Sequence, residues 1–190
     1  MKAIIGITGP MRSGKTTVQG IIKEELTSRG YKVSQHTFSD VLVDTCKLWH
    51  QPMTRDNLIG ISQVLRQFWG SDAMAHAVRQ RILLSEVDVV VLAGLRMFDA
   101  DYPFLRSFSN SYLVYINAPP ELCWRRSVEN PEKPDEAGAT FEDFTTRNQA
   151  STETEVPMFK EHADIVIDNF GFSVDDLGEI AKEFLRRINL

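Results

Sequence analysis

The sequence predicts an α/β fold of three layers, in which a five-stranded parallel sheet lies between two layers of helices. Two observations predict it. Short apolar, β-branched runs alternate with helical patterns along the chain, and a glycine-containing turn, GPMRSGKTT at residues 9–17, joins the first run to the first helical pattern. Alternating strands and helices form βαβ units, whose strands are parallel and buried on both faces. With 190 residues, we expect a single domain over residues 1–190.

Five segments are the expected strands. They are short, mainly apolar and bounded by turn residues, as buried strands of a parallel sheet are. The segments are KAIIGIT (residues 2–8), YKVSQHTFSD (31–40), VDVVVLAG (87–94), SYLVYINA (111–118) and ADIVIDN (163–169).

Helical patterns fill the stretches between these runs. The first begins at Lys15, places its apolar residues on one face and stops at Gly30, a usual C-terminal cap position. Residues 41–85 are mostly helical, with a break at Pro52 and an N-cap at Thr54. Further helices are expected after Pro119-Pro120, from about Thr140, and over SVDDLGEIAKEFLRRI at residues 173–188.

Charge and cysteine content exclude several classes of protein. The net charge of −5 is the opposite of what a nucleic-acid binder needs, so any bound polyanion should be small. Cys46 and Cys123 form no CxxC pair, which predicts neither a disulfide framework nor a zinc site and fits a reducing cytoplasm. The N-terminal MKAIIGITG is apolar over only a few residues, so we expect neither a signal peptide nor a membrane span.

The turn at residues 9–17 fits the phosphate-binding motif G-x-x-x-x-G-K-[ST] at every fixed position. Its glycines permit backbone turns that point N–H groups at a polyphosphate, at the positive end of the following helix. Lys15 is expected to reach the β- and γ-phosphates, and the Thr16 hydroxyl to bind magnesium. We therefore expect a P-loop NTPase fold with ATP and Mg²⁺ as cofactors. The expected nucleotide contacts are Gly9, Pro10, Met11, Arg12, Ser13, Gly14, Lys15, Thr16 and Thr17.

The layout resembles the nucleoside monophosphate kinase-like group of P-loop kinases, and more closely dephospho-CoA kinases and a set of archaeal-type nucleotide kinase-like proteins. Four segments carry the resemblance and together span nearly the whole chain. They are GPMRSGKTT; TFSD at 37–40; VVVLAGLR at 89–96, which is similar to the D-G-x-R strand end of the group; and ADIVIDNFGFSVDDL at 163–177, which is similar to the A-D-x-V-I-D-N-x-G-S segment of dephospho-CoA kinases.

This resemblance implies a helical acceptor-binding insert at about residues 41–85 and a lid at about residues 125–147. A closing lid excludes water, so that the γ-phosphate goes to the acceptor. Adjacent arginines on a helix cannot face the same way, so one of Arg125 and Arg126 is expected at the phosphates. We take Arg125 as the catalytic one. Arg147 is a further candidate on the lid, with a plain surface position as its alternative.

Asp40 corresponds to the presumed base of dephospho-CoA kinases, which accepts the proton of the attacking hydroxyl. Its alternative role is that of a helix N-cap, and one residue can serve both. Arg96 follows the central strand at the arginine of the D-G-x-R pattern, and it is expected in catalysis and acceptor binding. Arg55 and Arg66, in the insert, are expected to bind the acceptor, because the planar guanidinium matches phosphate oxygens. For all three arginines the alternative is a surface charge.

Asn169 and Gly171 follow the last strand, where the group contacts adenine; an ordinary turn into the final helix is the alternative. One position departs from the group. Ala93 ends the central strand where the group commonly has an aspartate, so this chain lacks a carboxylate that helps to hold magnesium.

The leading expectation is an ATP- and Mg²⁺-dependent kinase that phosphorylates a nucleoside monophosphate or a similar nucleotide. Dephospho-CoA is the second acceptor considered. Ala93 motivates an alternative of another class, a catalytically weak ATP-binding regulatory protein. We expect a cytoplasmic protein, monomeric or homodimeric, whose partner is a small phosphorylated acceptor and which binds neither nucleic acid nor membrane.

Overall fold

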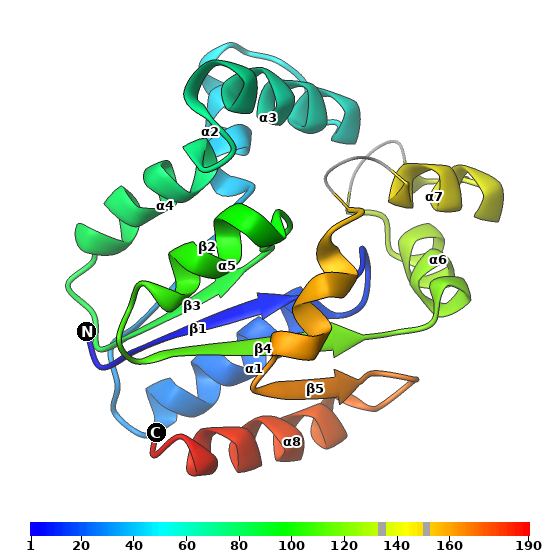
Figure 1. Cartoon of the computed structure of the whole chain (residues 1–190). Coiled ribbons are helices and arrows are strands. Elements are labelled where there is room, and N and C mark those ends of the chain that lie inside the picture. Colours follow the sequence, from blue (N-terminus) through cyan, green and yellow to red (C-terminus); the bar gives the residue numbers. More distant parts are fainter. Residues whose placement is uncertain (133–135, 150–152) are drawn as a thin grey trace.

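The structure is a computed structural model that describes residues 1–132, 136–149 and 153–190. A five-stranded, all-parallel sheet in the order β2-β3-β1-β4-β5 forms its centre, with helices on both faces (Figure 1). The predicted fold class is therefore confirmed. The strands are β1 (Ala3–Thr8), β2 (Val33–Thr37), β3 (Val89–Ala93), β4 (Ser111–Asn117) and β5 (Ile165–Asp168).

Each face of the sheet has its own apolar core, because alternate residues of a strand point to opposite faces. Ile5 and Ile7 of β1 pack among residues of α1 and α8, whereas Ile4 packs among residues of α2 to α5 and η2. The helices are α1 (Lys15–Ser28), α2 (Asp40–Leu48), α3 (Arg55–Trp69), α4 (Ala73–Leu83), α5 (Phe98–Arg106), α6 (Pro120–Glu129), α7 (Phe141–Asn148) and α8 (Val174–Arg187), with the 3-10 helix η2 (Val156–His162).

Strand order and register bring three chain segments to one place. β1 is the central strand, and it lies between β3 on one side and β4 on the other. Ala93, the last residue of β3, pairs with both Ile7 of β1 and Thr37 of β2. The segments after β1, β2 and β3 therefore meet at the carboxyl edge, where ligands bind in open parallel sheets.

Helix starts follow the capping signals of the sequence. The hydroxyl of Thr54 accepts the backbone N–H of Asn57 at 3.3 Å, and α3 begins at the next residue, as predicted. Thr140 and Asp143 form a capping box at the start of α7. The stretch 41–85, predicted as mostly helical, holds most of α2 and all of α3 and α4.

The structure adds two elements that the sequence did not predict, α5 and η2. Pro103 stands inside α5, where proline weakens a helical pattern, and η2 is a 3-10 helix of only seven residues. Part of the expected lid, residues 133–135, lies outside the described residues. In the described part of the chain, none of the helices is long and apolar enough to cross a membrane.

Candidate active site

The loop between β1 and α1 has a backbone that only glycine fits at two positions. Gly9 and Gly14 have φ angles of +142° and +104°, which side chains disfavour. A Cβ at Gly9 would lie 2.2 Å from the carbonyl oxygen of Ile116, and one at Gly14 would lie 2.5 Å from Nδ2 of Asn169. The loop is thus packed from behind by backbone and side chain, with its N–H groups at the start of α1, where an anion is favoured.

Lys15 is the first residue of α1, and its side chain folds back over the loop. Its Nζ donates hydrogen bonds to the carbonyl oxygens of Gly9 at 2.8 Å and Pro10 at 2.6 Å. Loss of water around the ammonium, and then the positive charge of Arg96, lower the pKa of Lys15 from 10.5 to about 7. The lysine therefore stands in a positively charged, poorly solvated place, where a polyphosphate would restore its charge.

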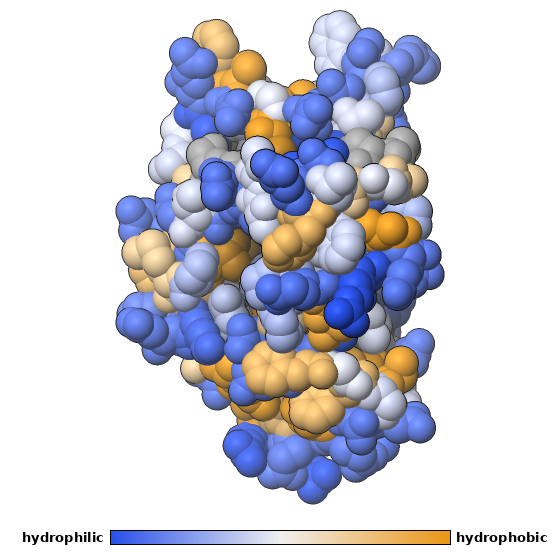
Figure 2. All heavy atoms as spheres, turned by 90° about the vertical axis from the view of Figure 1, so that its right-hand side faces the viewer, coloured by the Kyte–Doolittle hydropathy of each residue, from blue (hydrophilic) through white to orange (hydrophobic). Residues whose placement is uncertain are grey.

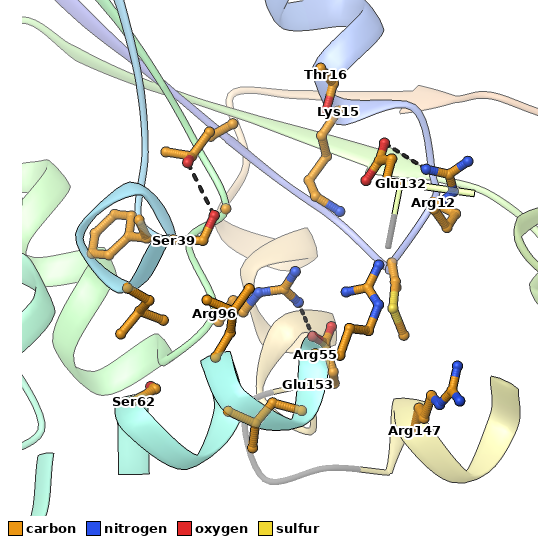
Figure 3. A pocket seen from close by; sticks show the side chains of 18 of the residues that line it. Arg12, Lys15, Thr16, Ser39, Arg55, Ser62, Arg96, Glu132, Arg147 and Glu153 are labelled. Atoms are coloured by element: carbon orange, nitrogen blue, oxygen red, sulfur yellow. Dashed lines mark hydrogen bonds and ion pairs between the residues drawn. The ribbon is translucent and has the colours of Figure 1, made fainter. Parts of the chain in front are cut away.

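A cavity of about 470 Å³ opens in front of the loop. Figure 3 shows the head groups of Lys15, Arg55 and Arg96 converging on it from different elements. Among the described residues, seven cationic side chains line the cavity against two carboxylates, Glu132 and Glu153. A chain of net charge −5 thus concentrates positive charge at one place, which suits a ligand with several negative charges. The cationic residues are Arg12, Lys15, Arg55, Arg66, Arg96, Arg126 and Arg147.

Apolar side chains line the part of the cavity under the insert helices. Phe38 is held there by an edge-to-face contact with Phe104, with ring centroids 5.7 Å apart. A ligand of this cavity therefore meets both guanidinium groups and an apolar wall. That wall consists of Phe38, Leu42, Leu58, Ile59 and Met74. The surrounding surface, viewed towards the carboxyl ends of the strands, is mostly hydrophilic with smaller hydrophobic patches (Figure 2).

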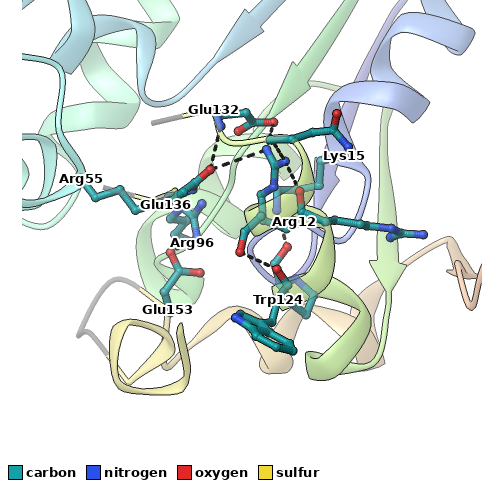
Figure 4. A network of polar contacts seen from close by, with 12 residues as sticks. Arg12, Lys15, Arg55, Arg96, Trp124, Glu132, Glu136 and Glu153 are labelled. Atoms are coloured by element: carbon teal, nitrogen blue, oxygen red, sulfur yellow. Dashed lines mark hydrogen bonds and ion pairs between the residues drawn. The ribbon is translucent and has the colours of Figure 1, made fainter. Parts of the chain in front are cut away.

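Ion pairs connect the phosphate loop, the insert and the segment after α6 (Figure 4). Arg12 of the loop pairs with Glu132 at 2.6 Å, and Arg55 of α3 donates to the buried Glu136, through Nε at 2.9 Å and also through Nη2. Arg96 pairs with Glu153 through Nη1 alone. Three of the cavity arginines, Arg12, Arg55 and Arg96, thus have carboxylate partners.

Arg126 of α6 lines the cavity, whereas Arg125 is exposed and does not. Arg126 donates to the carbonyl oxygen of Ser13 at 3.3 Å and to Oδ1 of Asn169 at 3.2 Å. Successive residues of a helix point about 100° apart, so only one of the pair reaches the site. The structure places Arg126 where the sequence assignment put Arg125.

Asp40 lies at the expected edge of the sheet, as the first residue of α2. Its carboxylate accepts the N–H of Thr37 at 2.7 Å and also the hydroxyl of Thr37. The cavity wall at this edge contains Thr37, Phe38 and Ser39 but not Asp40. The carboxylate thus fastens the turn between β2 and α2.

Neither of the two candidate adenine contacts lines this cavity. Asn169 is buried and donates from Nδ2 to the carbonyl oxygen of Ser13 at 2.8 Å, so its side chain supports the phosphate loop. Gly171 has a φ of +109° and does not line the cavity. Arg55, Arg66 and Arg96, by contrast, all line it, and so do Lys15 and Thr16.

Neither a protein-family model nor a curated protein matches the sequence. Solved structures match the fold. A shikimate kinase from Bacteroides thetaiotaomicron has a TM-score of 0.62 at 17% identity, over 97% of this chain and 98% of that chain. A shikimate kinase from Acinetobacter baumannii in complex with shikimate gives 0.58 at 17% identity, over 100% and 96%. A gluconokinase from Sinorhizobium meliloti 1021 gives 0.55 at 16% identity, over 98% and 93%.

The chain has the P-loop NTPase fold of shikimate kinases. These structural neighbours are small-molecule kinases, and at such low identities the likeness shows the fold alone. The finer resemblance to dephospho-CoA kinases stays a prediction.

Sequence reasoning missed the carboxylates that pair with the arginines of this cavity. Glu136 and Glu153 lie 81 and 57 residues from the arginines that they pair with, and no local motif marks them. Asp101 of α5 was also missed. Its Oδ2 accepts the N–H groups of Arg96 at 2.7 Å and Met97 at 3.0 Å, and burial raises its pKa from 3.8 to about 6. An aspartate just after the D-G-x-R-like segment was the available signal.

The loop offers one protein ligand for a magnesium ion, the Thr16 hydroxyl, which fits an ion that is bound mainly by the phosphates of a nucleotide. Thr16 lines the cavity at the start of α1, while Ala93 forms the end of β3 and supplies no carboxylate. In the part of the chain that the structure describes, no group of three or more His, Cys, Asp or Glu residues could hold a metal. Mg²⁺ often keeps several waters and binds through substrate phosphates, so a hydroxyl beside a triphosphate suits it.

Proposed function

We propose that the protein is an ATP- and Mg²⁺-dependent kinase that transfers the γ-phosphoryl group to the phosphate of a nucleoside monophosphate or a similar nucleotide. The observation that carries the proposal is the composition of one cavity. It joins the phosphate loop with Lys15 on one side to Arg55, Arg66 and Arg96 on the other. Two anionic groups can therefore bind next to each other, as donor and acceptor phosphates do.

The donor side uses the loop amides and Lys15 for the β- and γ-phosphates, with Thr16 as the protein ligand of Mg²⁺. When bound, the ion neutralises charge on the phosphate oxygens. Arg96 stands close enough to Lys15 to lower its pKa, so both cations act on the same region of the cavity. Fixed positive charges at the transferring group stabilise the charge that develops there. Arg126, which contacts Ser13 of the loop, joins them from α6.

A phosphate acceptor agrees with the position of Asp40 better than a hydroxyl acceptor does. A hydroxyl needs a base that takes its proton, and the base must lie within hydrogen-bond reach. The Asp40 carboxylate is bound by Thr37 and does not line the cavity. A phosphate monoester has lost most of its second proton at pH 7, since that pKa is about 6, and needs no base. The apolar wall at Phe38 and Met74 suits a nucleobase.

Ala93 supports a second candidate of another class, an ATP-binding regulatory protein with weak catalysis. The residue lines the cavity at the end of β3 without a carboxylate for the metal. Dephospho-CoA kinase activity is the other alternative. It rests on the sequence resemblance, and it requires Asp40 to leave Thr37 and reach the acceptor hydroxyl.

An acceptor screen tests the proposal. ADP release from ATP and Mg²⁺ is followed with the common nucleoside monophosphates, dephospho-CoA, shikimate and gluconate. We expect release that depends on a nucleoside monophosphate. Tight ATP binding that Lys15→Ala abolishes, together with no acceptor-dependent release, would favour the regulatory protein.

The Asp40→Asn variant separates the two kinase alternatives. With a phosphate acceptor, we expect kcat to fall by less than about tenfold, whereas a hydroxyl acceptor that depends on this base would lose about a hundredfold or more. Circular dichroism and thermal unfolding of the variant check that the turn at Thr37 has kept its fold.

A further inference from the structure

Asp101 lies in the first turns of α5 with its carboxylate directed into the protein, where it is 1% exposed. Its Oδ2 accepts two backbone N–H groups, from Arg96 and Met97. Arg96 follows β3 and sends its guanidinium into the cavity, where it pairs with Glu153 (Figure 3). The carboxylate of Asp101 therefore fixes the backbone from which an acceptor-side guanidinium projects.

The second oxygen of the same carboxylate accepts no hydrogen bond from the residues that the structure describes. Among the described residues, Oδ1 of Asp101 is buried without one, and so is Nε of Arg66 on α3. Burial lowers the pKa of the Arg66 guanidinium, and the negative charges of Asp101 and then Glu155 oppose this effect. Asp101 thus acts on Arg66 through its charge.

A role in folding alone does not account for this carboxylate. A buried, unpaired polar atom is costly, and native structures retain few of them. The two backbone N–H groups need one acceptor oxygen, which a neutral asparagine also supplies. What only aspartate adds is a negative charge beside two cationic residues that repel each other, since Arg96 lowers the pKa of Arg66.

We propose that Asp101 is a positioning residue for the acceptor side of the cavity: it holds the backbone from which Arg96 projects and places a negative charge behind the cavity wall that Arg66 and Arg96 line. The two backbone hydrogen bonds fix the direction of Arg96, and the negative charge offsets the repulsion between the guanidinium groups of Arg96 and Arg66, so that the anionic group of the acceptor meets a preformed cationic wall. The inference rests on the proposed function, because that function makes this side of the cavity the acceptor site. Preformed cationic groups bind an anion with a smaller loss of side-chain freedom.

Two substitutions at this position separate charge from backbone support. Asp101→Asn keeps an oxygen for the N–H groups of Arg96 and Met97 but removes the charge, and Asp101→Ala removes both. Asp99→Asn is the matched control, because Asp99 is an exposed carboxylate two residues earlier on α5. The measurements are the Kd of AMP and of inorganic phosphate by calorimetry, the Kd of a non-hydrolysable ATP analogue, and the melting temperature.

We expect Asp101→Asn to raise the Kd of both anionic probes by about tenfold, the usual size of a charge-assisted interaction, while the Kd of the ATP analogue, which Lys15 and the loop amides also bind, rises by a clearly smaller factor. Asp101→Ala should weaken binding further, and Asp99→Asn should bind as the wild type does. Arg66→Gln should raise the Kd of the anionic probes by a smaller factor in the Asp101→Asn background than in the wild type, because the two residues act together.

Wild-type affinity of Asp101→Asn for both probes would overturn the inference. Equal losses for AMP and for the ATP analogue, in step with a lower melting temperature, would overturn it too, since they would indicate general loss of structure. If the wild type binds the probes but phosphorylates no acceptor, the proposed function fails. The Kd values of the Asp101 variants then still show whether Asp101 supports the anion site. If the wild type binds neither probe, there is no acceptor-side anion site and the inference falls.

Discussion

The side-chain amide of Asn169 donates a hydrogen bond to the carbonyl oxygen of Ser13 at 2.8 Å, although 156 residues separate the two in the chain. Arg126 completes the contact by donating to both residues. The loop after the last strand and helix α6 therefore support the phosphate loop from behind. The geometry of the loop depends on side chains from the far end of the sequence.

Gly14→Ala is expected to disturb this support. The new Cβ would lie 2.5 Å from Nδ2 of Asn169, at a φ of +104° that alanine disfavours. We expect a loss of about 1–3 kcal/mol in the free energy of unfolding and a Kd for an ATP analogue at least about tenfold higher. Gly20→Ala is the control: nothing lies within 4 Å of its Cβ in α1, and it should stabilise by about 0.5–1 kcal/mol. Unchanged nucleotide binding in Gly14→Ala would contradict the account.

The adjacent arginines of α6 provide a matched pair. Arg126→Ala removes a cation that lines the cavity and contacts Ser13, so kcat/KM should fall by at least about tenfold. Arg125→Ala, at an exposed position, should leave kcat/KM within about twofold of the wild type, as surface substitutions usually do. Steady-state kinetics of the two variants at saturating ATP and varied acceptor make the comparison. Equal losses would show that Arg125 also reaches the phosphates.

Nucleotide binding should take up a proton at Lys15. The pKa of this lysine is lowered to about 7, so most of its side chain is in the neutral amine form at pH 8. A triphosphate beside it favours the charged form, and uptake should approach one proton per bound nucleotide. Calorimetric titrations of an ATP analogue at pH 8, in two buffers of different ionisation enthalpy, measure it.

Lys15→Arg is the control for this uptake, because arginine stays charged at pH 8. The variant should bind the analogue with little proton exchange. Binding to the wild type with the same heat in both buffers would show that Lys15 is already charged in the free protein.

Asp101 should make the protein less stable as the pH rises. Its pKa is raised from 3.8 to about 6, so between these values the folded protein holds a proton that the unfolded chain has lost. The free energy of unfolding should therefore fall as the pH rises from below 3.8 to well above 6, by about 3 kcal/mol in total at about 1.36 kcal/mol per pKa unit. The charged groups that act on Asp101 are Arg66 and Arg96.

Asp101→Asn should remove this part of the pH dependence. Urea unfolding of both proteins at pH 4.5 and pH 7 makes the comparison, in which the contributions of all other groups cancel. The free energy of unfolding of the variant, relative to that of the wild type, should be higher at pH 7 than at pH 4.5. Parallel curves for the two proteins would mean that Asp101 titrates near its ordinary value.

The sequence was sufficient to predict the sheet and the phosphate loop. Buried parallel strands need continuous apolar runs, which can be recognised in the sequence. The loop has no room for a side chain at Gly9 and Gly14, so both positions must be glycine, and the fixed spacing between them can also be recognised. The helix α5 was missed because Pro103 and several charged residues hide its apolar face. That helix is stabilised by packing against the sheet and η2, which a local pattern does not report.

The details of the site were harder to predict than its location. Whether Arg125 or Arg126 faces the cavity depends on the rotational phase of α6, and a change of one residue turns the side chain by about 100°. The Asp40 carboxylate accepts a hydrogen bond from Thr37, three residues before it, and the sequence pattern did not indicate this local contact. Glu136 and Glu153 reach their arginines through the tertiary fold alone.

Product analysis after incubation with ATP, Mg²⁺ and a nucleoside monophosphate tests the central claim most directly, with phosphorus NMR as the readout. We predict ADP together with the diphosphate of the acceptor nucleoside, with its new phosphoryl group on the acceptor phosphate and both products lost in Lys15→Ala. ATP that stays intact with every nucleoside monophosphate, or a phosphoryl group that appears on a hydroxyl or in free phosphate, would contradict the account.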